Sequence, residues 1–247
     1  MNRLIWLQHR GQVLWLLATL VALAGWLLFL DHLADGDLSA VAVQCDLGSG
    51  QVRHVCGPFV DDYRTLMNTL ATGLPAFAVV CGALLGAPLV AREIEQRTHL
   101  VAWSQSVSRR RWYTTKVAAV GGCLVLAGAV TGTVAYRLEG TFGRGGSITR
   151  WPWFHAMGFS PAVDALVAFA FGVTAGAVLR RTLPALAVSL VGTLAVILGI
   201  GGPFVAAGSD DDSDPFWLYQ FGYAGIGTAV AVATLVAGWF ATRRQTP

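Results

Sequence analysis

Long apolar runs separated by shorter polar segments dominate the hydropathy pattern of this chain. A helix needs about 20 mostly apolar residues to cross the hydrocarbon core of a bilayer. Six runs approach or exceed this length, and the fourth is the least uniform because Asp164 and Pro161 lie near its start. The pattern predicts an all-α integral membrane protein with six transmembrane helices in one domain over residues 1–247. The expected spans are approximately 13–30, 66–91, 117–136, 162–179, 183–207 and 221–241.

The composition supports a lipid environment. Hydrophobic residues make up 55% of the chain and charged residues only 13%, and the mean hydropathy is +0.58. A soluble domain of ordinary composition carries about a quarter charged residues. Membrane lipids are therefore the expected surroundings, and the net charge of +3 is too small to indicate a nucleic-acid partner.

Basic residues are distributed unevenly between the connecting segments. If the N-terminus is cytoplasmic, the segments 1–12, 91–116, 180–182 and 242–247 lie inside and hold twelve of the 17 basic residues. Lys and Arg are enriched in cytoplasmic loops of membrane proteins. We therefore expect a multi-pass protein of the plasma membrane with both termini in the cytoplasm.

The N-terminal region offers two further choices. Residues 1–12 mix apolar and basic side chains around Trp6, which predicts a short helix in the membrane interface, with a disordered tail as the alternative. The apolar run 13–30 could instead be a signal peptide. Its length exceeds the 7–15 residues of a usual signal core, so the sequence favours a retained span.

Two of the four cysteines fall in the first loop expected outside the cell. Cys45 and Cys56 lie in a compartment where disulfides persist, and we expect them to form one, with two free thiols as the alternative. Cys81 and Cys123 lie within spans and are expected to be small packing residues.

Pairs of glycines four residues apart occur in three of the expected spans. Such pairs let two helix backbones approach closely. They support a packed bundle and carry no information about transport. The pairs are Gly82/Gly86, Gly128/Gly132 and Gly172/Gly176.

The sequence lacks the motifs of several kinds of enzyme and of metal or cofactor sites. A P-loop needs Gly-Lys-Ser/Thr, but Thr115 precedes the only lysine, Lys116, so ATP hydrolysis by that route is excluded. The sequence predicts no metal site and no cofactor, and buried ionisable residues are expected to be nearly absent. All five histidines are expected in loops or interfacial segments; they are His9, His32, His54, His99 and His155.

The segment between the second and third expected spans is the longest inside segment. Leu100, Trp103 and Val107 recur on one stripe of a helix. Acidic residues precede this stripe, while Arg109–Arg111 and Lys116 follow it and are expected at the membrane surface. Two interpretations remain open on these grounds: a surface helix anchored to anionic lipid, or a helix that docks onto a partner.

This segment resembles the cytoplasmic loop of ABC transporter permeases of the second export type, and in particular their actinobacterial subgroup. The stretch Gly86–Glu93, the opening Trp6–Arg10 and the pair Trp217 and Gln220 resemble that subgroup as well. Arg97 and Ser106 stand where the family often has Gly and Pro. The residues that match the loop pattern with the family's spacing are Glu93, Glu95, Thr98, Val107, Ser108, Arg109 and Lys116.

The resemblance implies a six-span permease without its own ATPase domain. Two such permeases, identical or similar, pair with two ABC ATPase subunits. The ATPase subunits bind ATP and Mg, so the resemblance implies that this chain is not itself an enzyme. A coupling helix at about Glu93–Ser106 would sit in a groove of the ATPase. The contact residues this implies are Glu93, Glu95, Thr98, Leu100, Trp103, Val107 and Arg109.

The expected activity is export of a drug, a peptide or a lipid-like substrate. In this family, spans one, two and five typically face the translocation path or the other subunit. The few polar residues of spans two and five, Asn68, Thr72, Ser189 and Thr193, are therefore candidates for the lining of the path. Ser and Thr in spans also bond back to their own helix. The alternatives are a membrane anchoring or regulatory protein without a transport cycle, and a membrane-embedded enzyme, for which the sequence lacks an intramembrane ligand cluster.

Overall fold

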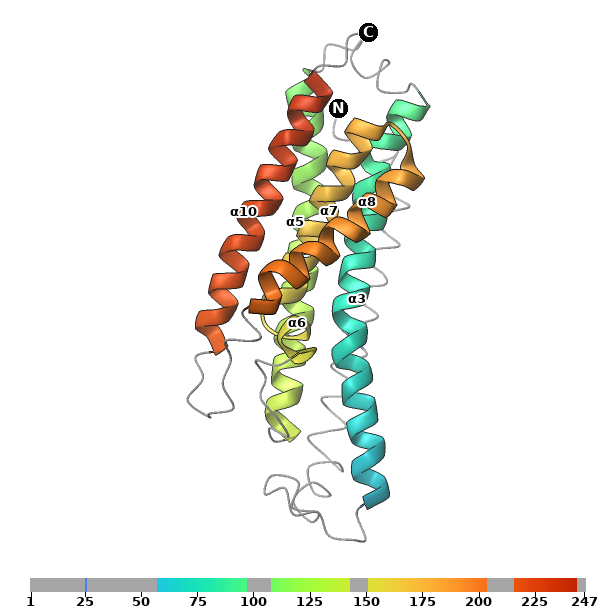
Figure 1. The fold of residues 1–247 in the computed structure, drawn as a ribbon. Coiled ribbons are helices and arrows are strands. Elements are labelled where there is room, and N and C mark those ends of the chain that lie inside the picture. The colour runs from blue at the N-terminus through green and yellow to red at the C-terminus, as the bar shows by residue number, and fades with distance from the viewer. Residues whose placement is uncertain (1–24, 26–56, 97–107, 143–150, 204–215, 244–247) are drawn as a thin grey trace.

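The structure is a computed structural model that describes residues 25, 57–96, 108–142, 151–203 and 216–243. These residues form a bundle of long helices (Figure 1). In chain order the elements are α3 (Gly57–Glu95), α5 (Arg109–Phe142), α6 (Trp153–Ala156), α7 (Ser160–Leu179), α8 (Thr182–Val196), the π-helical segment η3 (Ile197–Gly201) and α10 (Phe216–Arg243).

Five helices in the described part of the chain are long and apolar enough to span a membrane. The candidate membrane spans are Ala71–Glu95, Arg110–Arg137, Ser160–Leu179, Thr182–Gly201 and Phe216–Arg243. They confirm five of the predicted spans, including the fourth, in which Pro161 occupies the first turn of α7, where its missing N–H costs nothing. The first predicted span, the interfacial helix at 1–12 and the pair Cys45 and Cys56 lie outside the described residues, apart from the helical Gly25.

The helices extend beyond the ends that hydropathy marked. α3 begins at Gly57 and ends at Glu95, and α5 begins at Arg109 instead of near residue 117. A helix satisfies its backbone hydrogen bonds internally whether lipid or water surrounds it, so polar residues continue it past the apolar run. The expected cytoplasmic loop 91–116 was therefore too long, and the connection between α3 and α5 covers residues 96–108.

The centre of the bundle is α7, which contacts each of the other four long helices. In their most apolar stretches, 72% of α7 is buried, compared with 17% of α10. Ala and Gly fill much of its sequence, so neighbouring helices can approach it closely. The outward faces of α8 and α10 carry exposed apolar side chains, such as Leu183, Val191 and Phe221, which suits contact with lipid.

The glycine pairs lie where helices cross α7. A Cβ added at Gly86 would fall 2.9 Å from the Cα of Phe169, and one at Gly172 would fall 2.6 Å from the backbone N of Ala87. On α5, a Cβ at Gly128 would fall 2.5 Å from the Cα of Ala162. The expectation of a packed bundle is confirmed, and the structure adds that all three pairs serve contacts with one helix.

We expect Gly86→Ala to destabilise the bundle by roughly 1–3 kcal/mol, the usual cost of overpacking a close contact. The new methyl group would collide with the Phe169 backbone, which cannot turn aside as a flexible side chain could. Gly73→Ala is the matched control, because Gly73 lies on the same helix with nothing within 4 Å of its added Cβ. SDS titration of the free energy of unfolding compares the two, and equal stabilities would contradict the α3–α7 contact.

Candidate functional site at the basic end of the bundle

One end of the bundle collects most of its exposed positive charge. Here α3, α7 and α10 end while α5 and α8 begin (Figure 1). Among side chains that the structure describes, the opposite end carries the exposed Arg137. By the positive-inside rule the more basic end is expected in the cytoplasm, and this orientation stays a prediction. The exposed arginines at this end are Arg92, Arg110, Arg111, Arg180, Arg181 and Arg243.

A buried ion pair joins the end of α3 to the start of α5. The Lys116 ammonium donates to the Glu93 carboxylate, and the two side chains are only 5% and 8% exposed. The same ammonium lies 4.6 Å from the ring centroid of Trp112, within the range of a cation–π contact. Lys116 was expected at the membrane surface, and this expectation was wrong. Its long side chain reaches a carboxylate inside the bundle, which compensates the charge that burial removes from water.

The second glutamate at this end caps a helix. Glu95 Oε1 accepts the Thr182 N–H at 3.0 Å, and its Oε2 accepts the Thr182 hydroxyl at 3.0 Å. Thr182 is the first residue of α8, so its N–H has no partner within that helix. A carboxylate is also favoured there by the positive end of the helix dipole. Glu95 therefore fixes the end of α3 to the start of α8.

A buried polar cluster at the opposite end was missed by sequence reasoning. His155 of α6 places its Nδ1 3.0 Å from Asp164 Oδ2 of α7, and the Tyr223 hydroxyl of α10 donates to Asp164 Oδ1. His155 is 1% exposed, and Asp164 and Tyr223 are fully buried. His155 lies outside the candidate membrane spans, in the connection that precedes α7, but its burial was not expected. The expectation that buried ionisable groups are nearly absent was wrong. A carboxylate within an apolar span usually has a partner, and that was the available signal.

The His155 ring is enclosed on its far side by the end of the π-helical segment. A Cβ added at Gly201 would lie 2.6 Å from His155 Nε2, so glycine is required for this approach. Within the described part of the chain, Nε2 is buried without a hydrogen-bond partner. An ionised carboxylate only accepts hydrogen bonds, so the His155 Nδ1–H is the donor toward Asp164.

Gln220 of α10 joins α6 and α7 at the same end of the bundle through hydrogen bonds. Its Oε1 accepts from the Phe159 N–H at 3.0 Å and from the Ser160 hydroxyl at 3.1 Å, while its Nε2 donates to the Phe154 carbonyl at 3.0 Å. The side chain is fully buried. One amide thus satisfies backbone groups where α6 meets α7 and holds α10 against them. Each bond carries a few kcal/mol of desolvation cost if left unmade.

Residues 17–202, more than half of the chain, match the family model described as ABC-2 membrane transporter related. The chain belongs to this family. No curated protein and no solved structure is significantly similar to it. Membership makes the chain a membrane component of a transporter, in agreement with the five apolar helices in the part of the chain that the structure describes. Membership in a family of transporter membrane subunits is also consistent with the expectation that the chain is not itself an enzyme.

The residues of this ABC-2 protein that were expected to contact an ATPase lie around the connection between α3 and α5. Glu93 and Glu95 occupy the end of α3 and are held by partners on α5 and α8, and Arg109 opens α5. Their contact with an ATPase stays a prediction. The remaining four, which include the apolar stripe, lie outside the described residues; they are Thr98, Leu100, Trp103 and Val107.

The four polar residues expected to line a path fall into two environments. Ser189 and Thr193 are fully buried; the Ser189 hydroxyl donates to the Ala168 carbonyl of α7 at 2.6 Å, and Thr193 bonds back to the Ser189 carbonyl. Asn68 and Thr72 are exposed on α3, and Thr72 also bonds back to the Asn68 carbonyl at 2.6 Å. In this conformation the α8 pair packs against α7, whereas the α3 pair faces outward. Their role in a path stays a prediction.

Proposed function

We propose that this chain is the transmembrane permease subunit of an ATP-driven ABC exporter. It would pair with separate ATP-binding subunits and with a second permease, identical or similar, in the plasma membrane. Two facts support this division of labour: the chain belongs to the ABC-2 family, and its sequence lacks the Gly-Lys-Ser/Thr of a P-loop. ATP and Mg would then bind the partner ATPase and not this chain.

The observation that carries the proposal is the anchoring of the connection between α3 and α5. Glu93 links the end of α3 to Lys116 of α5, and Glu95 links it to Thr182 of α8. A displacement of the end of α3 would therefore act on the starts of α5 and α8 as well. A coupling segment needs this property, because ATP hydrolysis in a partner can do work on the bundle only through rigid connections.

The transport direction and the class of cargo follow from the family resemblance. A drug, a peptide or a lipid-like molecule would be moved outward, with the basic end of the bundle facing the cytoplasm. Two copies are proposed because the described helices pack around a central α7 that is largely buried, and the family works as two bundles. The path would then form between the bundles.

Trp103→Ala should weaken association with the ATPase by about thirty-fold or more. An aromatic anchor in a desolvated pocket commonly costs about 2 kcal/mol or more when truncated, and about 1.4 kcal/mol corresponds to a factor of ten. The measurement is the binding curve of the ATPase that co-purifies with the wild-type chain, titrated against wild-type and variant permease in nanodiscs. ATP hydrolysis stimulated by the permease should fall in parallel.

Trp151→Ala is the control for this experiment. Trp151 is 53% exposed, and its ring lies 5.2 Å from that of His155 in α6. Because α6 lies at the opposite end of the bundle, the loss of Trp151 should leave ATPase binding unchanged. If Trp103 were instead buried among lipid headgroups, Trp103→Ala would alter membrane insertion and leave ATPase binding intact. Unchanged assembly in a correctly inserted variant would reject the coupling role of Trp103.

A further inference from the structure

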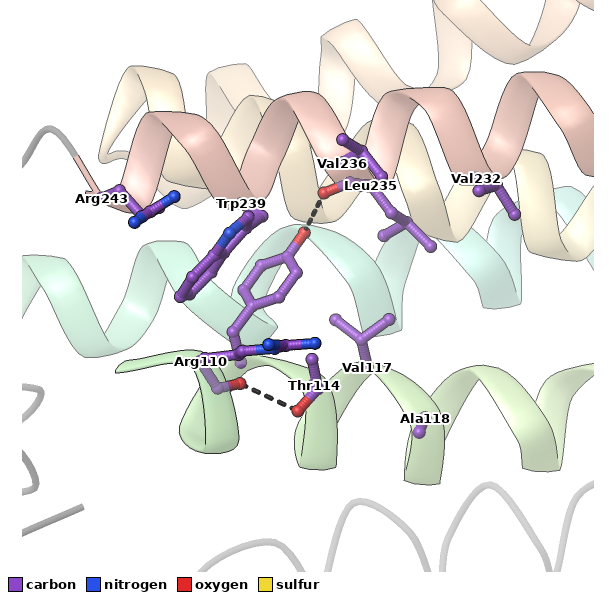
Figure 2. A pocket seen from close by; sticks show the side chains of 10 residues that line it. Arg110, Thr114, Val117, Ala118, Val232, Leu235, Val236, Trp239 and Arg243 are labelled. Atoms are coloured by element: carbon purple, nitrogen blue, oxygen red, sulfur yellow. Dashed lines mark hydrogen bonds between the residues drawn. The ribbon is translucent and has the colours of Figure 1, made fainter. Parts of the chain in front are cut away.

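A groove between α5 and α10 opens at the basic end of the bundle (Figure 2). Its volume of about 810 Å³ lies within the range of small-molecule sites, roughly 300–1,000 Å³. Most of its lining is apolar. The residues that line it are Arg110, Tyr113, Thr114, Val117, Ala118, Val232, Leu235, Val236, Trp239 and Arg243.

The groove has a polar end and an apolar end. Arg243, Trp239 and Arg110 lie toward one end, and Val232 and Ala118 lie toward the other (Figure 2). The eleven steps from Val232 to Arg243 rise about 16 Å along α10, at about 1.5 Å a step. Half of the hydrocarbon core of a bilayer is about 15 Å. The groove therefore has the length of one leaflet.

Of the polar side chains that line the groove, the arginines are the ones available to bind a ligand. The Tyr113 hydroxyl already donates to the Leu235 carbonyl at 2.8 Å, and the Thr114 hydroxyl donates to the Arg110 carbonyl at 2.8 Å. The Arg243 guanidinium stacks over Trp239, 5.6 Å from its ring centroid. The Arg110 guanidinium makes no ion pair with any residue that the structure describes, and it is exposed. A ligand at this end would thus meet two positive charges.

We propose that this groove binds an anionic phospholipid of the leaflet at the basic end of the bundle. One acyl chain would lie along Val117, Val232 and Val236, and the phosphate would lie beside Arg110 and Arg243. Guanidinium groups bind phosphate with charge-assisted hydrogen bonds, and basic pockets between membrane helices are known places for acidic headgroups. The inference concerns the isolated permease and does not depend on its ATPase partner.

The lining disfavours a helix of a second permease as the occupant. Helices that associate in membranes bring small residues to the contact, as the glycines facing α7 do in this protein. The groove instead presents branched and aromatic side chains, and it contains no glycine. The exposed Arg110 guanidinium at its mouth would also face the apolar surface of such a helix.

The test is native mass spectrometry of the full chain in detergent, titrated with phosphatidylglycerol or phosphatidylcholine of equal chain length. The wild-type chain should retain one phosphatidylglycerol with an affinity at least about tenfold above that for phosphatidylcholine. The double variant Arg110→Gln/Arg243→Gln should lose this preference. Ala118→Trp, which fills the apolar end at an exposed position, should lower retention of both lipids by about tenfold.

Arg111→Gln is the matched control. Arg111 is exposed on the same turn of α5 as Arg110 but does not line the groove, so its loss should leave the preference unchanged. Equal retention of the two lipids by the wild-type chain would overturn the proposal. So would an equal loss of preference in Arg111→Gln, which would indicate a diffuse charge effect. If Ala118→Trp changed the oligomeric mass and not lipid retention, the occupant would be a second copy and the proposal would fail.

Discussion

Glu93→Gln should destabilise the permease by roughly 3–5 kcal/mol, the usual cost of removing one partner from a buried ion pair. The substitution keeps the size of the side chain and removes its charge. Lys116 is then left 5% exposed without its counter-charge, because Glu93 is its carboxylate partner in the described part of the chain. SDS titration of the purified protein measures the change in the free energy of unfolding.

The double variant Glu93→Gln/Lys116→Met separates the pair from its single members. The double variant leaves no unpaired charge at this site, although the buried amide that replaces Glu93 still needs a partner, so it should recover part of the lost stability. The control is Glu95→Gln, which weakens an exposed helix cap and should cost about 1 kcal/mol. A double variant as unstable as Glu93→Gln alone would show that the ion pair does not account for the effect.

The same substitution tests the link between stability and transport. If Glu93 and Lys116 transmit motion from residues 96–108 to α5, the double variant should still bind the ATPase. It should stimulate ATP hydrolysis less than the wild-type chain, because the two helix ends are no longer joined. Full stimulation by the double variant would leave the ion pair a purely structural role.

The sequence predicted the helices well because a span that faces lipid needs a long run of apolar residues, and such a run is visible in the sequence. Each of the apolar runs from the second to the sixth became a long helix. Their ends were less predictable. α3 continues to Glu95 and α5 starts at Arg109, since a helix persists past its apolar part wherever its backbone bonds and side-chain contacts support it.

The sequence did not predict which helices contact one another. The glycine pairs indicated close packing, but nothing in their spacing named α7 as the common partner. Glu93 and Lys116 are 23 residues apart, and both had been placed on a surface loop because charged residues usually lie there. Ser189 shows the same limit: its hydroxyl bonds to a carbonyl of α7, which only the packed bundle brings within reach.

The largest effect at the opposite end of the bundle is expected from Asp164→Ala. This change removes the acceptor of both the His155 ring N–H and the Tyr223 hydroxyl, in a site where all three side chains are at most 1% exposed. Each buried polar group deprived of its partner costs about 1–3 kcal/mol. The expected loss is therefore roughly 2–6 kcal/mol in the free energy of unfolding.

Thr174→Val provides the control on the same helix. The Thr174 hydroxyl donates to the Thr234 carbonyl of α10 at 2.7 Å, so its loss removes one neutral hydrogen bond between α7 and α10 and should cost about 1 kcal/mol. A loss no larger than this in Asp164→Ala would contradict the cluster as a major source of stability.

Asp164→Asn distinguishes charge from hydrogen bonding. Asparagine can still accept the Tyr223 hydroxyl, but its amide group would donate toward His155 Nδ1. The ring must then carry its proton on Nε2, which the Gly201 backbone encloses and for which the described residues supply no acceptor. Asp164→Asn should thus lose most of the stability that Asp164→Ala loses. The further variant Asp164→Asn/His155→Phe should regain part of it, because it removes the ring nitrogen that lacks an acceptor. Near-wild-type stability of Asp164→Asn alone would show that the carboxylate charge and the tautomer of His155 are not what holds α6 to α7.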